Sequence, residues 1–255
     1  MKNLQDIIQE KLQIGSKSKI SQYKYHPKDK NELRKILKQL LGERGKDADL
    51  NDINTSKITD MSRLFAYLDP HNIDISQWDV SNVNTMEGMF FNCIHFNCDL
   101  SNWDVSNTKN MFGIFFQCKQ FNSDLSAWDV SNVINMKGAF ESCHNFNSDL
   151  NEWDVSKVTD MSWMFRDCEK FNSDLSKWNV SNVTNMKGTF EYCHNFNSDL
   201  NKWNVSKVRD MESMFKGSIF NGDLSKWKVS KLCNIYQMFM DSPLENSEPN
   251  WYINF

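Results

Sequence analysis

Tryptophan recurs along this chain at an almost constant spacing. Neighbouring copies are 25 residues apart, and the last two intervals are 24: Trp78, Trp103, Trp128, Trp153, Trp178, Trp203, Trp227 and Trp251. A fixed period of this length is typical of units that are too small to bury their own apolar face and must stack on their neighbours. The period therefore predicts one elongated stack of similar coils rather than two globular domains.

The repeated unit is specific in sequence. Counted from Trp as position 0, it reads W-[DN]-V-S-[NK]-V-x-[ND]-M-x-x-x-F-x-x-C-x-x-F-N-x-D-L-[SN]-x. The register extends back to Asp49, with Ile53 in place of Trp, and a truncated coil begins at Trp251. We therefore expect two parts: a segment over residues 1–48, and about eight repeats plus a truncated coil over residues 49–255.

The spacing of apolar residues predicts the local structure of each repeat. Apolar positions 5, 8, 12 and 15 follow one face of a helix of about ten residues, with the Ser of position 3 as its N-cap. The pattern L-x-x-W-x-V predicts a three-residue strand with one buried face. The expected fold class is an α/β solenoid with short parallel strands on one side, short helices on the other and a helical cap at the amino end.

These motifs resemble a known family. L-S-x-W-D-V-S-x-V-x-x-M-x-x-x-F-x-x-C-x-x-F is similar to the L-x-x-L-x-L of leucine-rich repeats, and its end resembles the A-F-x-x-C-x-x-L signature of the bacterial BspA-like subfamily. The form F-N-x-D-L-S-x-W-D-V-S-N-V closely resembles the mycoplasma-type branch, a domain of unknown function. The resemblance runs from Asp49 to about Phe255. It implies a leucine-rich-repeat-like solenoid that binds other macromolecules, often at a cell surface.

Residues 1–48 differ in charge from the repeats. They hold twelve Lys and Arg against six Asp and Glu, a net charge of +6 in a chain whose total is −4. Asp29 and Glu32 form a variant capping box ahead of an apolar stripe at Leu33, Ile36, Leu37, Leu40 and Leu41. We expect a helix over residues 29–41 that covers the first coil, preceded by a weaker helix over 4–12 and a linker at 15–18. The alternative is a basic segment that binds phosphate or an acidic partner.

The residues that could carry chemistry fall into rows that packing explains. One row holds Cys93, Cys118, Cys143, Cys168 and Cys193, but a spacing of 25 is not that of a metal site. We interpret this row as core and expect Cys98 and Cys233, which lie outside it, to be more exposed. His144 and His194 lie two coils apart, too far for a shared zinc ion. Motifs typical of enzymes are lacking, so we predict no enzyme, no metal and no cofactor.

A second row repeats Asp at position 21. Its members would repel one another at a coil spacing of about 4.8 Å: Asp49, Asp74, Asp99, Asp124, Asp149, Asp174, Asp199 and Asp223. Asx turns, in which each carboxylate accepts backbone N–H groups, would offset the repulsion. A row of Ca²⁺ sites is the alternative and needs more carboxylates in each coil.

The polar strand face, formed by positions 24 and 1, is our candidate binding surface. Position 24 changes from Gln77 to Lys226, and the face changes from acidic to basic along the chain. The candidate partner-binding residues are Asp79, Asp104, Asp129, Asp154, Lys177, Asn179, Lys202, Asn204, Lys226 and Lys228. Drift on a solvated surface would give the same gradient. We predict that this face binds a partner of opposite charge polarity.

Composition limits the partners and the location. The net charge of −4 does not suit a nucleic-acid-coating protein, and no apolar run approaches the length of a membrane span. Asp6, Gln9 and Glu10 interrupt the apolar stretch that a signal peptide needs. We expect a monomeric protein that is cytoplasmic by default, whereas the family resemblance allows a surface location.

The sequence therefore favours a non-enzymatic repeat scaffold that binds a protein partner, still unknown, through the polar strand face. A cell-surface adhesin or carbohydrate-binding protein is the first alternative, but it would need exposed aromatic residues on that face. A structural assembly component that stacks end to end is the second.

Overall fold

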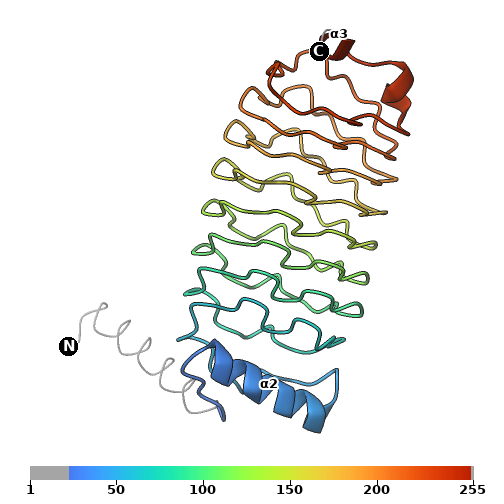
Figure 1. The fold of residues 1–255 in the computed structure, drawn as a ribbon. Helices are drawn as coiled ribbons and strands as arrows, with labels where there is room; N and C mark the ends of the chain where they lie inside the picture. The colour runs from blue at the N-terminus through green and yellow to red at the C-terminus, as the bar shows by residue number, and fades with distance from the viewer. Residues whose placement is uncertain (1–22, 254–255) are drawn as a thin grey trace, which may run out of the picture.

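The computed structural model of this protein describes residues 23–253. Its named elements are helix α2 (Lys30–Arg44), the short 3-10 helix η1 (Pro243–Asn246) and helix α3 (Asn250–Ile253). Between α2 and η1 the chain forms turns and single β-bridges, and Figure 1 shows these as coils stacked one on another, from α2 at one end to α3 at the other. The predicted helix over residues 4–12 and the linker at 15–18 lie outside the described residues.

Parallel bridges hold neighbouring coils in register at position 7. They join Asp60, Thr85, Asn110, Asn135, Asp160, Asn185, Asp210 and Asn234 in sequence. The strand predicted around each Trp is not formed in the described residues, and this expectation is wrong. The reason is local: the Trp103 N–H, for example, donates to the Leu100 carbonyl 3.1 Å away, three residues earlier in the same chain, and so closes a turn.

The ten-residue helix predicted in each repeat is also wrong. In the turn segment, positions 8 to 15, the backbone N–H groups alternate between two partners, as the repeat of Trp78 shows. Four of them donate to carbonyls of the next coil at 2.7–2.9 Å: those of Met86, Gly88, Phe90 and Asn92. Three others donate to carbonyls three residues earlier at 3.0 Å: those of Met89, Phe91 and Cys93. A helix would use all of these groups within its own coil and leave none to join the coils.

This alternation requires a left-handed backbone at positions 10 and 14. Gly88 (φ 55°) and Asn92 (φ 57°) adopt it in one repeat, and Trp163 (φ 56°) holds it with a large side chain. A non-glycine residue in this region costs about 1–2 kcal/mol, which the bonds between coils offset. At Gly188 a side chain is excluded for a second reason, since an added Cβ would lie 2.6 Å from the Trp163 ring.

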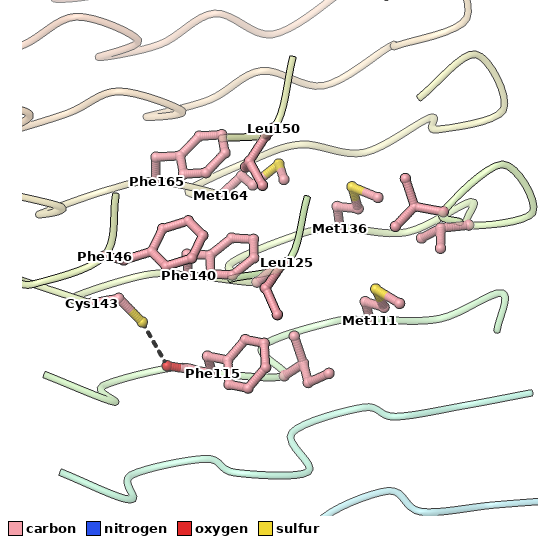
Figure 2. Close-up of a cluster of buried hydrophobic side chains, with 14 of the residues drawn as sticks. Met111, Phe115, Leu125, Met136, Phe140, Cys143, Phe146, Leu150, Met164 and Phe165 are labelled. Atoms are coloured by element: carbon pink, nitrogen blue, oxygen red, sulfur yellow. Dashed lines mark hydrogen bonds between the residues drawn. The ribbon is translucent and has the colours of Figure 1, made fainter. Parts of the chain in front are cut away.

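The apolar rows are buried although the helices are absent. Phe90 and Phe115 stack with ring centroids 5.5 Å apart, and Phe140 and Phe165 do so at 5.6 Å. Figure 2 shows the rings of Phe115, Phe140 and Phe165 one above another, with Leu side chains beside them. Stacked aromatic rings bury a large apolar area per side chain and so contribute strongly to the stability of the fold.

The Trp row joins the coils by a polar contact as well as by packing. Trp103 and Trp128 lie nearly parallel, 6.5 Å apart. Each Trp of the row donates its Nε1–H to a main-chain carbonyl of the preceding coil, as Trp128 does to Leu100 at 2.9 Å. A buried Trp needs such a partner for its only donor, and the constant spacing provides one in every coil.

Helix α2 covers the first coil. The Asp29 side chain caps it by accepting the N–H groups of Asn31 and Glu32. The sequence predicted the helix over 29–41, and the structure extends it to Arg44. Its buried side chains join the core of the repeats: Leu33, Leu37, Leu40 and Leu41.

Candidate partner-binding face

The acidic half of the polar strand face is a row of turns. The carboxylate of Asp79 accepts the Ser81 N–H at 3.1 Å and the Ser81 hydroxyl at 2.6 Å. The same backbone bond is made by five further residues of position 1: Asp104, Asp129, Asp154, Asn179 and Asn204. The expectation that this Ser accepts a backbone N–H as an N-cap is therefore wrong. The Ser is the donor, and the acceptor is the residue two places before it. All of these residues remain exposed.

The hydrogen bonds also fix the charge of this row. The Ser131 hydroxyl and N–H lower the pKa of Asp129, and those of Ser156 do the same for Asp154. Both carboxylates are therefore ionised at neutral pH and leave a negative surface at the amino half of the face.

The Asp row at position 21 forms the predicted Asx turns. Asp124 accepts the Ser126 N–H at 2.9 Å, and Asp174 accepts the Ser176 N–H at 2.9 Å. Neither of the metal-compatible side-chain clusters found among residues 23–253 includes a member of this row. The geometry favours turns over the row of Ca²⁺ sites.

The basic half of the polar strand face contains an open hollow. Its volume is about 550 Å³, and we name it the basic hollow after its lining residues: Asn201, Lys202, Trp203, Asn204, Ser206, Lys226 and Lys228. The structure thus brings together four of the ten predicted residues around one depression. Lys177 lies outside this lining and forms an ion pair with Glu152. The acidic residues of the row, and Asn179, do not line the hollow.

The lysines of the basic hollow differ from Lys177 in their pairing. None of the ion pairs found within residues 23–253 involves Lys202, Lys226 or Lys228. Asp223 is close enough to Lys226 for its pKa to be affected, but its carboxylate already accepts the Ser225 N–H and the Asn201 amide. The hollow therefore presents positive charge to solvent.

The cysteine row is a core row, as the spacing predicted. The Cys143 thiol donates to the Phe115 carbonyl of the preceding coil at 3.0 Å (Figure 2). Burial raises the pKa of Cys93 to about 12, so its thiol is unreactive at neutral pH. Cys98 and Cys233 are 8% and 6% exposed, against 0% for the row, so they are slightly more exposed, as expected, although both are still buried. Both belong to the core cluster.

His144 and His194 do not share a metal-compatible cluster in the described residues, but two other histidines meet. His144 contacts Asp167 and Glu169, whereas His194 is exposed and belongs to neither metal-compatible cluster of the described residues. Asp69, His71 and His95 form a second group whose ligand atoms lie within 4.8 Å of one another. Sequence reasoning missed this group. The available sign in the sequence was His71, which stands at position 18, where the following repeats have Phe.

The structure also reveals aromatic side chains that the motif did not predict on a surface. Phe91 and Phe116 directly follow the core Phe of their repeats and stack at 4.4 Å, and Tyr67 lies 5.5 Å from Phe91. Tyr67 is 66% exposed. We call Tyr67, Phe91 and Phe116 the outer aromatic row. The doubled Phe in two repeats was the available signal.

The sequence matches one known protein family. The model of a family described as "Mycoplasma protein of unknown function, DUF285" matches twice, at residues 35–153 and 134–251. The chain belongs to this family. No curated protein and no solved structure is significantly similar to it.

Both candidate surfaces of this DUF285 protein lie inside the family matches. The basic hollow falls within residues 134–251, and the outer aromatic row within 35–153. Among residues 23–253 no helix has the length and apolar character needed to cross a bilayer.

Proposed function

We propose that this protein is a non-enzymatic repeat solenoid that binds an acidic segment of a protein partner in the basic hollow. The observation that carries the proposal is the convergence of Lys202, Lys226 and Lys228 on one open depression without a carboxylate in its lining. Unpaired lysines on a concave surface attract carboxylates and steer their approach. The side chains of the hydrophobic rows, by contrast, are buried between the coils, where a partner does not reach them.

The charge distribution along the polar strand face would also fix the orientation of a bound partner. Ionised Asp129 precedes the Glu152–Lys177 ion pair, ionised Asp154 lies between its two members in sequence, and the basic hollow follows it. A partner with an acidic end and a basic end fits this polarity in one orientation only. The relationship to BspA-like leucine-rich repeats, and the surface location that it implies, remain part of this proposal.

The test uses a fluorescently labelled deca-glutamate peptide and the full chain. We expect the fluorescence anisotropy to rise on binding at low salt and the affinity to fall as salt is added, because exposed charges are screened. The triple variant Lys202→Glu, Lys226→Glu and Lys228→Glu is expected to weaken binding at least about tenfold.

A charge-matched control separates the hollow from net charge. Lys57→Glu, Lys170→Glu and Lys231→Glu change the total charge equally at exposed lysines that do not line the hollow. This control should bind the peptide almost as well as the unchanged protein. Equal weakening by both triple variants would reject the hollow as the binding site.

The outer aromatic row supports a second candidate, carbohydrate binding. The adhesin alternative needed exposed aromatic rings. Tyr67 is exposed, and the half-buried rings of Phe91 and Phe116 continue its row on the turn segment rather than on the polar strand face. Calorimetric titration with cello- and chito-oligosaccharides tests it. Heat that disappears in the Tyr67→Ala variant would favour this candidate over the peptide-binding one.

A further inference from the structure

Two imidazoles and one carboxylate meet between the first two coils. Asp69 and His71 come from the coil of Ile53, and His95 comes from the coil of Trp78. One nitrogen of each imidazole and one Asp69 oxygen lie within 4.8 Å of one another. The two rings are 4.9 Å apart between centroids and tilted by 54°.

The backbone around these three residues is held in place. Asp69 accepts the His95 N–H at 3.0 Å, and its second oxygen lies 2.9 Å from His95 Nδ1. The His71 N–H donates to Lys46 at 2.9 Å, and its carbonyl accepts the Asn97 N–H at 3.2 Å. The backbones of His71 and His95 and the carboxylate of Asp69 are therefore positioned before any ligand arrives, which lowers the entropy cost of binding.

We propose that Asp69, His71 and His95 form a binding site for a divalent transition-metal ion of the Zn²⁺ class. Imidazole nitrogen and carboxylate oxygen are ligands that such ions prefer. Bonds of about 2.0–2.2 Å at tetrahedral angles place ligand atoms about 3.4 Å apart, so a pair at the 4.8 Å limit must close by about 1.4 Å. The His95 side chain is 57% exposed, and water can complete a four-coordinate site.

The second metal-compatible cluster shows why this one is preferred. Asp167 lies 3.2 Å from His144 Nε2, whereas Glu169 lies 3.7 Å from Nδ1 of the same ring. The two nitrogens point away from each other, so one ion cannot join the ring and both carboxylates at those contacts. His144 therefore serves as a matched control.

A nearby cation opposes metal binding and provides a further test. The Lys46 ammonium donates to the Leu68 carbonyl, one residue before Asp69. Its charge repels a divalent ion at close range. Lys46→Gln keeps a donor for that carbonyl and removes the charge, so it should tighten metal binding by about two- to fivefold.

The experiment titrates Zn²⁺ into the full chain after removal of any purification tag. We expect one ion per chain in calorimetry, and at least about tenfold weaker binding in His71→Ala and in His95→Ala. Co²⁺ provides a spectroscopic check. Bound through nitrogen and oxygen, it should show visible absorption without the near-ultraviolet band of a thiolate–Co²⁺ bond, because the thiols are buried in the core.

The controls are His144→Ala and His194→Ala, which should bind Zn²⁺ like the unchanged protein. Circular dichroism of each variant shows whether it is folded. Binding that survives in the His71→Ala/His95→Ala double variant would overturn the proposal, and so would an absence of binding at micromolar Zn²⁺. A thiolate band with Co²⁺ would place the ion at cysteine instead.

Discussion

The two ends of the stack expose opposite backbone groups in the turn segment. Since each coil there donates N–H groups to the carbonyls of the next, the first coil has carbonyls without a preceding coil. Arg34 of helix α2 donates to the carbonyls of Leu64 and Ala66. Lys46, just after the helix, donates to the carbonyl of Leu68. Cationic side chains thus replace the missing coil at the amino end.

The last coil has the opposite requirement. Its N–H groups point beyond the stack, and the Asp241 N–H donates to the Glu245 carboxylate at 3.0 Å. Trp251 and Tyr252 cover Phe239 from this side, but Leu232 and Tyr236 are 81% and 65% exposed. An anionic side chain completes this end, and less apolar surface is covered than at α2.

The comparison teaches that the turn segment has a polarity like that of a helix. Carbonyls at one end attract cations and N–H groups at the other attract anions, as at the termini of an α-helix. Here the polarity runs along the stack, across coils, rather than along one continuous chain segment. The predictions below test the two ends against each other.

The largest effect is expected from Leu37→Ala in α2. Leu37 is fully buried between the helix and the first coil, so its truncation should lower the free energy of unfolding by about 2–5 kcal/mol. Leu244→Ala makes the same change in η1 at the other end and should cost roughly half or less. Urea denaturation measures both, and equal losses would contradict the difference between the ends.

Arg34→Met should have the next largest effect. It keeps the aliphatic length and removes the guanidinium donors from the first-coil carbonyls, at a cost of about 1–2 kcal/mol. Hydrogen exchange should accelerate in residues 60–68 and remain unchanged near residue 240. Arg34→Lys restores one donor and is expected to recover part of the loss; exchange that accelerates equally at both ends would argue against a local role.

Acid should destabilise the amino end through Asp52. Its hydrogen bond with Arg44 lowers the pKa of Asp52 in the folded protein. The contribution is therefore complete above the unfolded pKa of about 3.9 and is lost as the pH falls through the lower folded value. Asp52→Asn should remove this part of the pH dependence of stability below about pH 4. An unchanged acid profile in that variant would count against the pair.

The smallest effect is expected from Glu245→Gln. The side chain is exposed, and its loss of charge should change the free energy of unfolding by only about 0.5 kcal/mol. The local effect is more specific, because the Asp241 amide should exchange faster with solvent. Nuclear magnetic resonance of the two proteins measures it, and an Asp241 amide that exchanges at the same rate in both would show that Glu245 is not its cap.

The sequence predicted burial much better than backbone structure. Val83, Met86, Phe90 and Cys93 are buried as the spacing required, yet they lie on successive turns rather than on a helix. Steps of three and four residues bring side chains to one side in either conformation. Gly88 and its equivalents were the available sign of a left-handed backbone.

The candidate sites likewise differ in whether the sequence predicted them. Lys202 and Lys226 were predicted from the row at position 24 and Lys228 from the row at position 1, because surface residues at a fixed period share a face. His71 and His95 escaped prediction, since they occupy different repeat positions and meet only through the path of two adjacent turns. The outer aromatic row escaped for a related reason: a helix would have directed Phe91 and Phe116 differently.

The period and the apolar pattern by themselves determined that the coils stack, which side chains fill the core, and that α2 precedes the first coil. Only the tertiary structure decided whether each backbone N–H bonds within its own coil or to the next. That choice depends on a neighbouring coil being present, and no local sequence contains it. The polarity of the two ends follows from that choice.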